Sequence, residues 1–203
     1  MLTRGRQRGF NLIEVAVTVS VLALLVATAA PSMVDFIRSA RLRSLAEATQ
    51  NGLQRARSEA LKRNQVVTFY LVSPNNTALP DNTCTVVTDS AAWVVSLDDP
   101  THGCAGPDRT TGLPATPRIV EGYGPGAAGN GIIVAGLAAD GATAASSVSF
   151  NGYGQRVGAG ALANIDITNS DGSGRLMRIQ VTPSGGIRMC DKRVLAPDPR
   201  ACV

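Results

Sequence analysis

The feature that most limits the fold of this chain is an uncharged segment close to its beginning. Residues 15–34 carry no charged side chain, and Arg4, Arg6 and Arg8 precede them. About twenty such residues are enough to span a bilayer as a helix. Because basic residues stay on the cytoplasmic side, the chain after residue 34 is expected outside the cytoplasm.

A secretory signal peptide is the simplest alternative for this segment. Ala27-Thr28-Ala29 has the small-residue pattern of a signal cleavage site, and cleavage there would release a secreted protein such as an enzyme. Two features argue against it. Glu14 places a charge at the start of the apolar region, and the helical pattern continues past Ala30.

The residues around Glu14 match a more specific signal. The stretch Gly9-Phe10-Asn11-Leu12-Ile13-Glu14 resembles the processing site of type IV pilins and pseudopilins. The resemblance implies that prepilin peptidase removes the leader 1–9 after Gly9 and N-methylates Phe10. It also implies that Glu14 pairs with the terminal amine of a neighbouring subunit, which would offset the cost of a carboxylate in hydrocarbon. Pro31 falls where pilins commonly carry a helix-breaking proline.

The helical pattern continues beyond the apolar segment. We expect a transmembrane and assembly helix over residues 10–33, which Pro31 should kink or locally melt, and an amphipathic helix over 34–63. In the second helix one stripe recurs at helical spacing and should lie on a sheet. The stripe consists of Leu42, Leu45, Thr49, Leu53, Ala56 and Ala60.

From residue 64 the pattern becomes strand-like, which predicts a β-rich domain over 64–203. Aromatic residues make up only 4% of the chain, so its core should be mainly aliphatic. A long helix followed by strands favours an α+β fold, with the helix packed on an antiparallel sheet. The expected strands are 66–72, 92–97, 118–122, 131–136, 147–157, 163–169 and 175–183, with loops at 98–117 and 122–130.

The four cysteines form two pairs that are local in sequence, Cys84 with Cys104 and Cys190 with Cys202. An even number of cysteines beside a membrane segment suggests disulfides in an oxidising compartment. Three connectivities are open, and we favour the local one. Each bridge would stabilise the fold by about 3 kcal/mol in the chain-entropy account. The alternative is four reduced cysteines in the core.

The last part of the chain is the most basic part of the β-rich domain. Residues 175–203 carry six basic and two acidic side chains. Four of the basic residues flank the second cysteine pair, and together they could bind DNA phosphates or an acidic partner. They are Arg188, Lys192, Arg193 and Arg200.

Two late motifs narrow the resemblance. The stretches SFNGYGQ and RIQVTPSGGIRMC resemble the subgroup of minor pilins and pseudopilins that contains FimT, FimU and GspH. In the FimT branch a G-R-x-R motif at this place is linked to DNA uptake. Gly185-Gly186-Ile187-Arg188 keeps only the last arginine of that motif, and no aromatic residues for base stacking lie nearby, so a solvated or protein-binding surface is favoured over DNA.

No pattern of catalytic or cofactor-binding residues stands out, and we expect neither an enzyme nor a bound cofactor or metal. His102 is the only histidine, and with Asp98, Asp99 and Cys104 it makes a weak metal pattern that reads better as a turn beside a disulfide. The glycines at 124, 126 and 129 fit G-x-G-x-x-G, but a strand pattern follows where a nucleotide site needs a helix.

The sequence therefore predicts a minor type IV pilin, a structural subunit that starts or caps a pilus. Its partners would be other major and minor pilins, prepilin peptidase and the inner membrane, with a single membrane pass and the β-rich domain in the periplasm. A type II secretion pseudopilin of the GspH kind is the main alternative. A DNA-binding minor pilin for natural transformation is another.

Overall fold

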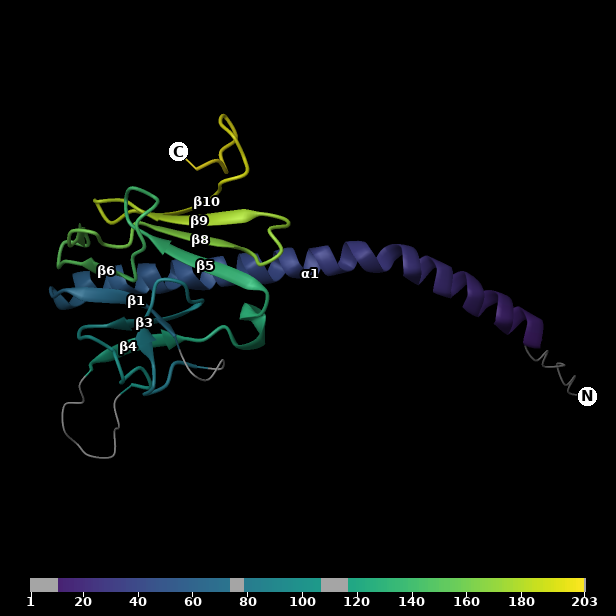
Figure 1. Ribbon diagram of the computed structural model, residues 1–203, viewed down its shortest axis with the longest axis horizontal. Helices are drawn as coiled ribbons and strands as arrows, with labels where there is room; N and C mark the ends of the chain where they lie inside the picture. Colours follow the sequence, from purple (N-terminus) through teal and green to yellow (C-terminus); the bar gives the residue numbers. More distant parts are fainter. Residues whose placement is uncertain (1–10, 74–78, 107–116, 203) are drawn as a thin grey trace, which may run out of the picture. The chain divides into compact units, whose positions relative to one another are not determined.

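The computed structural model describes residues 11–73, 79–106 and 117–202, with the backbone alone for 28–32, 34 and 35. The chain forms two compact units, Met1–Arg38 and Ser39–Val203. One helix, α1 (Leu12–Arg63), contributes to both (Figure 1). Its backbone stays helical through residue 31, which excludes local melting at Pro31.

Ten strands follow α1 in the part of the chain that the structure describes. They are β1 (Val67–Ser73), β2 (Thr85–Val86), β3 (Ala92–Ser96), β4 (Ile119–Tyr123), β5 (Ile132–Leu137), β6 (Ser147–Phe150), β7 (Arg156–Val157), β8 (Asn164–Asn169), β9 (Leu176–Val181) and β10 (Ile187–Asp191). A short 3-10 helix, η1 (Gly126–Gly129), precedes β5. The glycine-rich stretch thus leads into a strand, as the sequence predicts.

The α+β class and the antiparallel pairing are confirmed, but the strands divide between two sheets. The first sheet has the order β4-β3-β1-β6-β7, with β2 beside β1, and the second has the order β10-β9-β8-β5. All strand pairs are antiparallel. In Figure 1 strands β8, β9 and β10 are drawn above the second half of α1 and strands β3 and β4 below it, while β1, β5 and β6 overlap the helix in this view.

One face of the second half of α1 is buried against these sheets, and the opposite face is exposed. All six residues of the predicted stripe from Leu42 to Ala60 are at most 2% exposed. Five of them, all except Thr49, share one core with side chains of both sheets, which include Phe69, Trp93, Val148, Phe150, Ile165, Ile167 and Ile179. Gly52 allows α1 to approach Trp93 of β3 closely, because a Cβ at this position would lie 2.7 Å from the Trp93 ring. The buried stripe of the amphipathic helix is therefore part of the main hydrophobic core.

The structure differs from the prediction at one predicted strand and at two strands that were not predicted, β10 and the two-residue β2. The expected single strand 147–157 is a hairpin, because the Asn151 side-chain oxygen accepts hydrogen bonds from the backbone N–H groups of Tyr153 and Gln155 and forms a turn. Strand β10 was not predicted, although it pairs with β9 along its whole length. Residues 107–116 of the predicted 98–117 loop lie outside the described residues.

Candidate functional site

The first half of α1 presents apolar side chains without a partner in the described chain. Leu12, Ile13, Leu22 and Leu24 are between 61% and 86% exposed, and every described side chain over 11–27 is exposed. Burying such a surface would be strongly favourable, at about 25 cal/mol per Å² of apolar area. The described chain leaves this apolar surface of the first half of α1 exposed, so a different apolar surface is needed to bury it.

Polar groups in this half are few, and two of them are satisfied within the helix. The Thr18 hydroxyl donates to the Val15 carbonyl at 2.9 Å, and the Ser20 hydroxyl donates to the Ala16 carbonyl at 2.7 Å. Both groups are thereby removed as unsatisfied donors in an apolar medium. Within 11–27, Glu14 is the one charged residue.

Glu14 lies in the first turn of α1, where its side chain is exposed. The backbone N–H groups of Glu14 and Val15 donate to the Asn11 carbonyl at 3.0 and 3.2 Å, so the helix begins directly before this carboxylate. The positive end of the helix dipole stabilises a carboxylate at that position. Gly9 and Phe10, the predicted processing residues, lie outside the described residues.

The predicted transmembrane helix can be compared with the structure only in part. Within the described part of the chain, no helix reaches both the length and the hydropathy that a membrane crossing requires. The predicted uncharged segment 15–34 includes residues 28–32 and 34, whose side chains lie outside that part.

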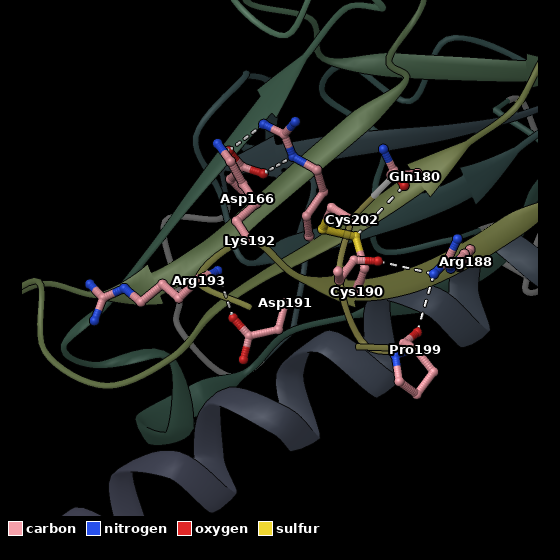
Figure 2. The surroundings of a disulfide bond; sticks show 11 residues. Asp166, Gln180, Arg188, Cys190, Asp191, Lys192, Arg193, Pro199 and Cys202 are labelled. Carbon is pink, nitrogen blue, oxygen red and sulfur yellow. Dashed lines mark hydrogen bonds and ion pairs between the residues drawn. A yellow bond between two sulfur atoms is a disulfide. The ribbon is translucent and has the colours of Figure 1, made fainter. Parts of the chain in front are cut away.

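The structure brings the predicted C-terminal cations together around the second disulfide. Cys190 is bonded to Cys202, with their Cα atoms 5.1 Å apart (Figure 2). The Arg188 guanidinium donates to the backbone carbonyls of Pro199 at 3.3 Å and Ala201 at 3.0 Å. This arginine thereby holds the chain just before Cys202.

The other three cations also have partners within the chain. Lys192 Nζ lies 3.2 Å from Asp166 Oδ2, and Arg200 pairs with Asp198 at 2.7 Å. The Arg193 guanidinium donates to the carbonyls of Gly172 and Gly174. The hydrogen bonds from Arg200 lower the pKa of Asp198 to about 2. A phosphate would have to compete with these contacts at each of the four predicted residues.

Asp166 is the centre of the charge network on the outer face of the second sheet. Arg178 binds both of its oxygens, at 2.5 and 2.7 Å, and both side chains are at most 15% exposed. Burial acts to raise the pKa of Asp166, but the hydrogen bonds from Arg178 and Lys192 outweigh it and leave the pKa below its ordinary value. The network joins β8, β9 and the residue after β10.

The first disulfide lies on the outer face of the first sheet. Cys84 is bonded to Cys104, with their Cα atoms 6.1 Å apart. Both cysteines are buried in a small second cluster with Val72, Ala92 and Val94. Together the two bridges give the sequence-local connectivity, and the structure describes no free cysteine.

Three residues of the weak metal pattern near this disulfide, Asp98, Asp99 and Cys104, have other partners in the structure. Asp98 binds the guanidinium of Arg118 at 2.7 Å, which with the backbone N–H of Arg118 lowers the pKa of Asp98 to about 2. Asp99 accepts from the backbone and hydroxyl of Thr101, and Cys104 is in the disulfide. No group of three metal-binding side chains occurs in the described ranges.

Sequence reasoning missed the junction that joins the two late motifs. The Arg57 guanidinium of α1 donates to the Gly154 carbonyl at 3.1 Å. Gly185 lies against the same carbonyl, since a Cβ there would be 1.8 Å from its oxygen, and its φ of +80° also favours glycine. The signal was present in the glycines of SFNGYGQ and TPSGG, but their contact with a helix residue about a hundred positions earlier depends on the tertiary fold.

Taken together, these features define a class of protein. A globular domain packs on one face of the second half of α1, the first half of the same helix exposes large apolar side chains, and Glu14 lies in its first turn. Such a chain is a structural subunit of the pilin and pseudopilin class.

The family is shown by sequence comparison. The family model described as "Type II transport protein GspH" matches residues 45–185, which is more than half of the chain. The chain belongs to this GspH family. Among curated proteins, no relative matches it.

Two similar solved structures are crystal forms of one protein, the type IV minor pilin FimU of Pseudomonas aeruginosa. The form in space group P21 is 16% identical, covers 76% of this chain and 91% of its own, and has a TM-score of 0.42. The form in space group P65 is 15% identical, covers 72% of this chain and 90% of its own, and has a TM-score of 0.39.

Proposed function

We propose that this chain is a minor type IV pilin that enters the filament through the first half of α1 and helps to start or cap pilus assembly. The observation that carries the proposal is the contrast within α1: large apolar side chains from Leu12 to Val26 are exposed, whereas the stripe from Leu42 to Ala60 is buried. An exposed apolar helix of this kind needs an apolar partner. The lipid of the inner membrane before assembly, and the helices of neighbouring pilins after it, would supply one.

In this proposal Glu14 sets the position of the subunit in the filament. Its carboxylate is costly in an apolar surrounding unless a positive group neutralises it. The N-terminal amine of a neighbouring subunit is the proposed partner. Cleavage after Gly9 by prepilin peptidase would leave Phe10 as the methylated terminal residue. A mature mass that starts at Phe10 and includes one methyl group is expected; a mature chain that starts at Ala30 would contradict this step.

The assembly role is tested by filament yield in a strain that lacks this chain. We expect sheared surface pili to be lost or strongly reduced and to return when the wild-type chain is supplied. Unchanged pilus yield would contradict the starting role. Other pilus subunits should remain at normal levels in the membrane, so that a loss of filaments reports assembly and not expression.

A type II secretion pseudopilin is the second candidate, and the match to the GspH family favours it. The same helix and domain would serve in either machine. In this case loss of the chain would leave surface pili unchanged and would cause exported proteins to accumulate in the periplasm. Both readouts come from the same deletion strain.

A DNA-binding pilin is less well supported. Arg188, Lys192, Arg193 and Arg200 contact groups of their own chain, and DNA would have to replace those contacts. DNA binding that falls steeply with salt and weakens with Arg188→Ala would favour this candidate. No binding at low salt would exclude it.

A further inference from the structure

Strand β10 is one of the two outer strands of the second sheet, and one of its edges faces away from β9. The N–H of Lys192 bonds to the Leu176 carbonyl, and the N–H of Thr182 bonds to the Gly186 carbonyl. Because bonded positions alternate in an antiparallel pair, the backbone groups of Ile187, Met189 and Asp191 point to the outer edge.

The end of the chain returns along this edge. We call residues 192–202 the C-terminal strap. The N–H of Asp191 donates to the Arg200 carbonyl at 2.7 Å, and Asp191 forms a parallel bridge with Ala201. The strap thus takes the last outward position of β10, and among the described segments none pairs with Ile187 or Met189 on that side.

The strap is held at both ends. At its start, Lys192 binds Asp166, and Arg193 binds the carbonyls of Gly172 and Gly174. At its end, the Cys190–Cys202 bond and the two hydrogen bonds from Arg188 fix residues 199–202 (Figure 2). Arg188 therefore acts as a latch for the segment that the disulfide closes.

The composition of the strap suits a cover and not a further strand. It contains Pro197 and Pro199, which have no N–H to offer to another chain. An open strand edge is a template for pairing with a second chain, and proteins cover or blunt such edges. The strap ends the sheet where β10 would otherwise extend it.

The other outer strands are blunted by different means. Strand β7 is only two residues long. Strand β4 carries the charged residue Glu121, close to the point where the register of the β3–β4 pairing shifts. On the outer edge of strand β5 one position is occupied, since the Gly136 N–H donates to the Thr88 carbonyl and the Gly136 carbonyl accepts from the Ala145 N–H. In the described part of the two sheets, β10 is the outer strand that depends on a covalently closed segment.

We propose that the strap is a redox-locked edge cover, with Arg188 as its latch, and that opening it lets β10 pair with β10 of a second copy. A second copy fits because the edge is self-complementary. In an antiparallel pair centred on Met189, the outward groups of Ile187 in one copy face those of Asp191 in the other. Opening needs a dithiol reductant, which breaks the Cys190–Cys202 bond, gives each sulfur one electron and one proton, and becomes a cyclic disulfide.

The test uses the full chain in detergent micelles. In the double variant Cys190→Ser with Cys202→Ser, at protein concentrations low enough to keep it monomeric, hydrogen exchange at the Asp191 amide should become about tenfold faster or more, because its protection depends on local opening of the strap. Sedimentation should show a dimer whose fraction rises with protein concentration. The matched control, Cys84→Ser with Cys104→Ser, should keep the slow amide and the mass of the wild type.

Two further variants separate edge pairing from misfolding. Met189→Pro, added to the unlocked variant, removes an N–H that points outward and is not used with β9, so it should restore the monomer while the Asp191 amide stays fast. Arg188→Ala alone should speed exchange of that amide without a change in disulfide content. An Asp191 amide that stays protected in the unlocked variant that also carries Met189→Pro would overturn the lock, and an unlocked variant that stays monomeric at high protein concentration would overturn the pairing.

Discussion

The two halves of α1 contain similar apolar residues, but these residues are exposed in the first half and mostly buried in the second. Leu24, in the first half, is 69% exposed, whereas Leu53, in the second half, is fully buried. Both halves are continuous α-helix, so the local backbone does not explain the difference. The second half finds its apolar partner in the two sheets of its own chain, and the first half finds none among the described residues. An apolar helix face therefore indicates that the helix packs against an apolar partner, and that partner need not belong to the same molecule.

The largest difference should appear when the two leucines are shortened. Leu53→Ala should lower the free energy of unfolding by about 2–5 kcal/mol, the usual cost of a buried leucine lost from a packed core. Leu24→Ala should change it by less than about 0.5 kcal/mol, as an exposed substitution does. Denaturant unfolding of both variants in the same detergent measures the contrast. Equal losses of unfolding free energy in the two variants would contradict the claim that the second half of α1 is packed in the core and the first half is not.

Loss of the first disulfide should have the next largest effect on stability. Replacing both Cys84 and Cys104 by serine should cost about 3 kcal/mol, because the bridge closes a loop of about twenty residues in the unfolded chain. Since this bridge also fills the small cluster on the outer face of the first sheet, the loss should not fall well below that value. The shift in unfolding midpoint against the wild type tests it, with the reduced wild type as a second comparison. An unchanged midpoint would contradict it.

A smaller effect is expected at the charge network of the second sheet. Asp166→Asn should destabilise the fold by about 1–3 kcal/mol, the range for hydrogen bonds to charged groups. Asp98→Asn, whose partner Arg118 is about half exposed, should cost less, because exposed pairs contribute little. Thermal unfolding of the two variants side by side ranks them. A larger loss at Asp98 would contradict this ranking.

The same carboxylate predicts a dependence on pH. The pKa of Asp166 is held below its ordinary value of 3.8 in the folded chain. Its contribution to stability is therefore complete above about pH 5 and is lost as the pH falls below the ordinary pKa toward the folded one. The wild type should lose more stability than Asp166→Asn between pH 5 and about pH 3. Parallel pH profiles of the two proteins would contradict this assignment.

The sequence predicted the parts of the fold that depend on local pattern. The stripe from Leu42 to Ala60 was found because helical spacing and apolar character coincide there. Six of the seven predicted strands have a counterpart that differs by at most two residues at either end, because β-branched residues between turn signals mark them. Strand β10 was missed because it is short, follows two glycines, and contains Arg188 and Cys190 on its outer face.

What sequence reasoning could not give was the pairing of distant segments. Strand β6 pairs with β1 and β5 pairs with β8, and no local pattern says which of two sheets a strand will join. The same reason hid the role of Arg188. Its charge suggested a phosphate ligand, but the carbonyls of Pro199 and Ala201 come within reach only when the end of the chain folds back on β10.

The most direct test of the account is the incorporation of two single variants into filaments. Glu14→Ala removes the carboxylate of the half that has no partner in the described chain. Glu47→Ala removes an exposed carboxylate from the other half, where it pairs with Arg43 at 2.8 Å. The measurement is the amount of this chain in purified filaments relative to its amount in the membrane. We predict a loss of about tenfold or more for Glu14→Ala, since an unpaired terminal amine would remain in an apolar surrounding. We predict wild-type incorporation for Glu47→Ala. Equal incorporation of the two variants would contradict the claim that the first half of α1 assembles through Glu14.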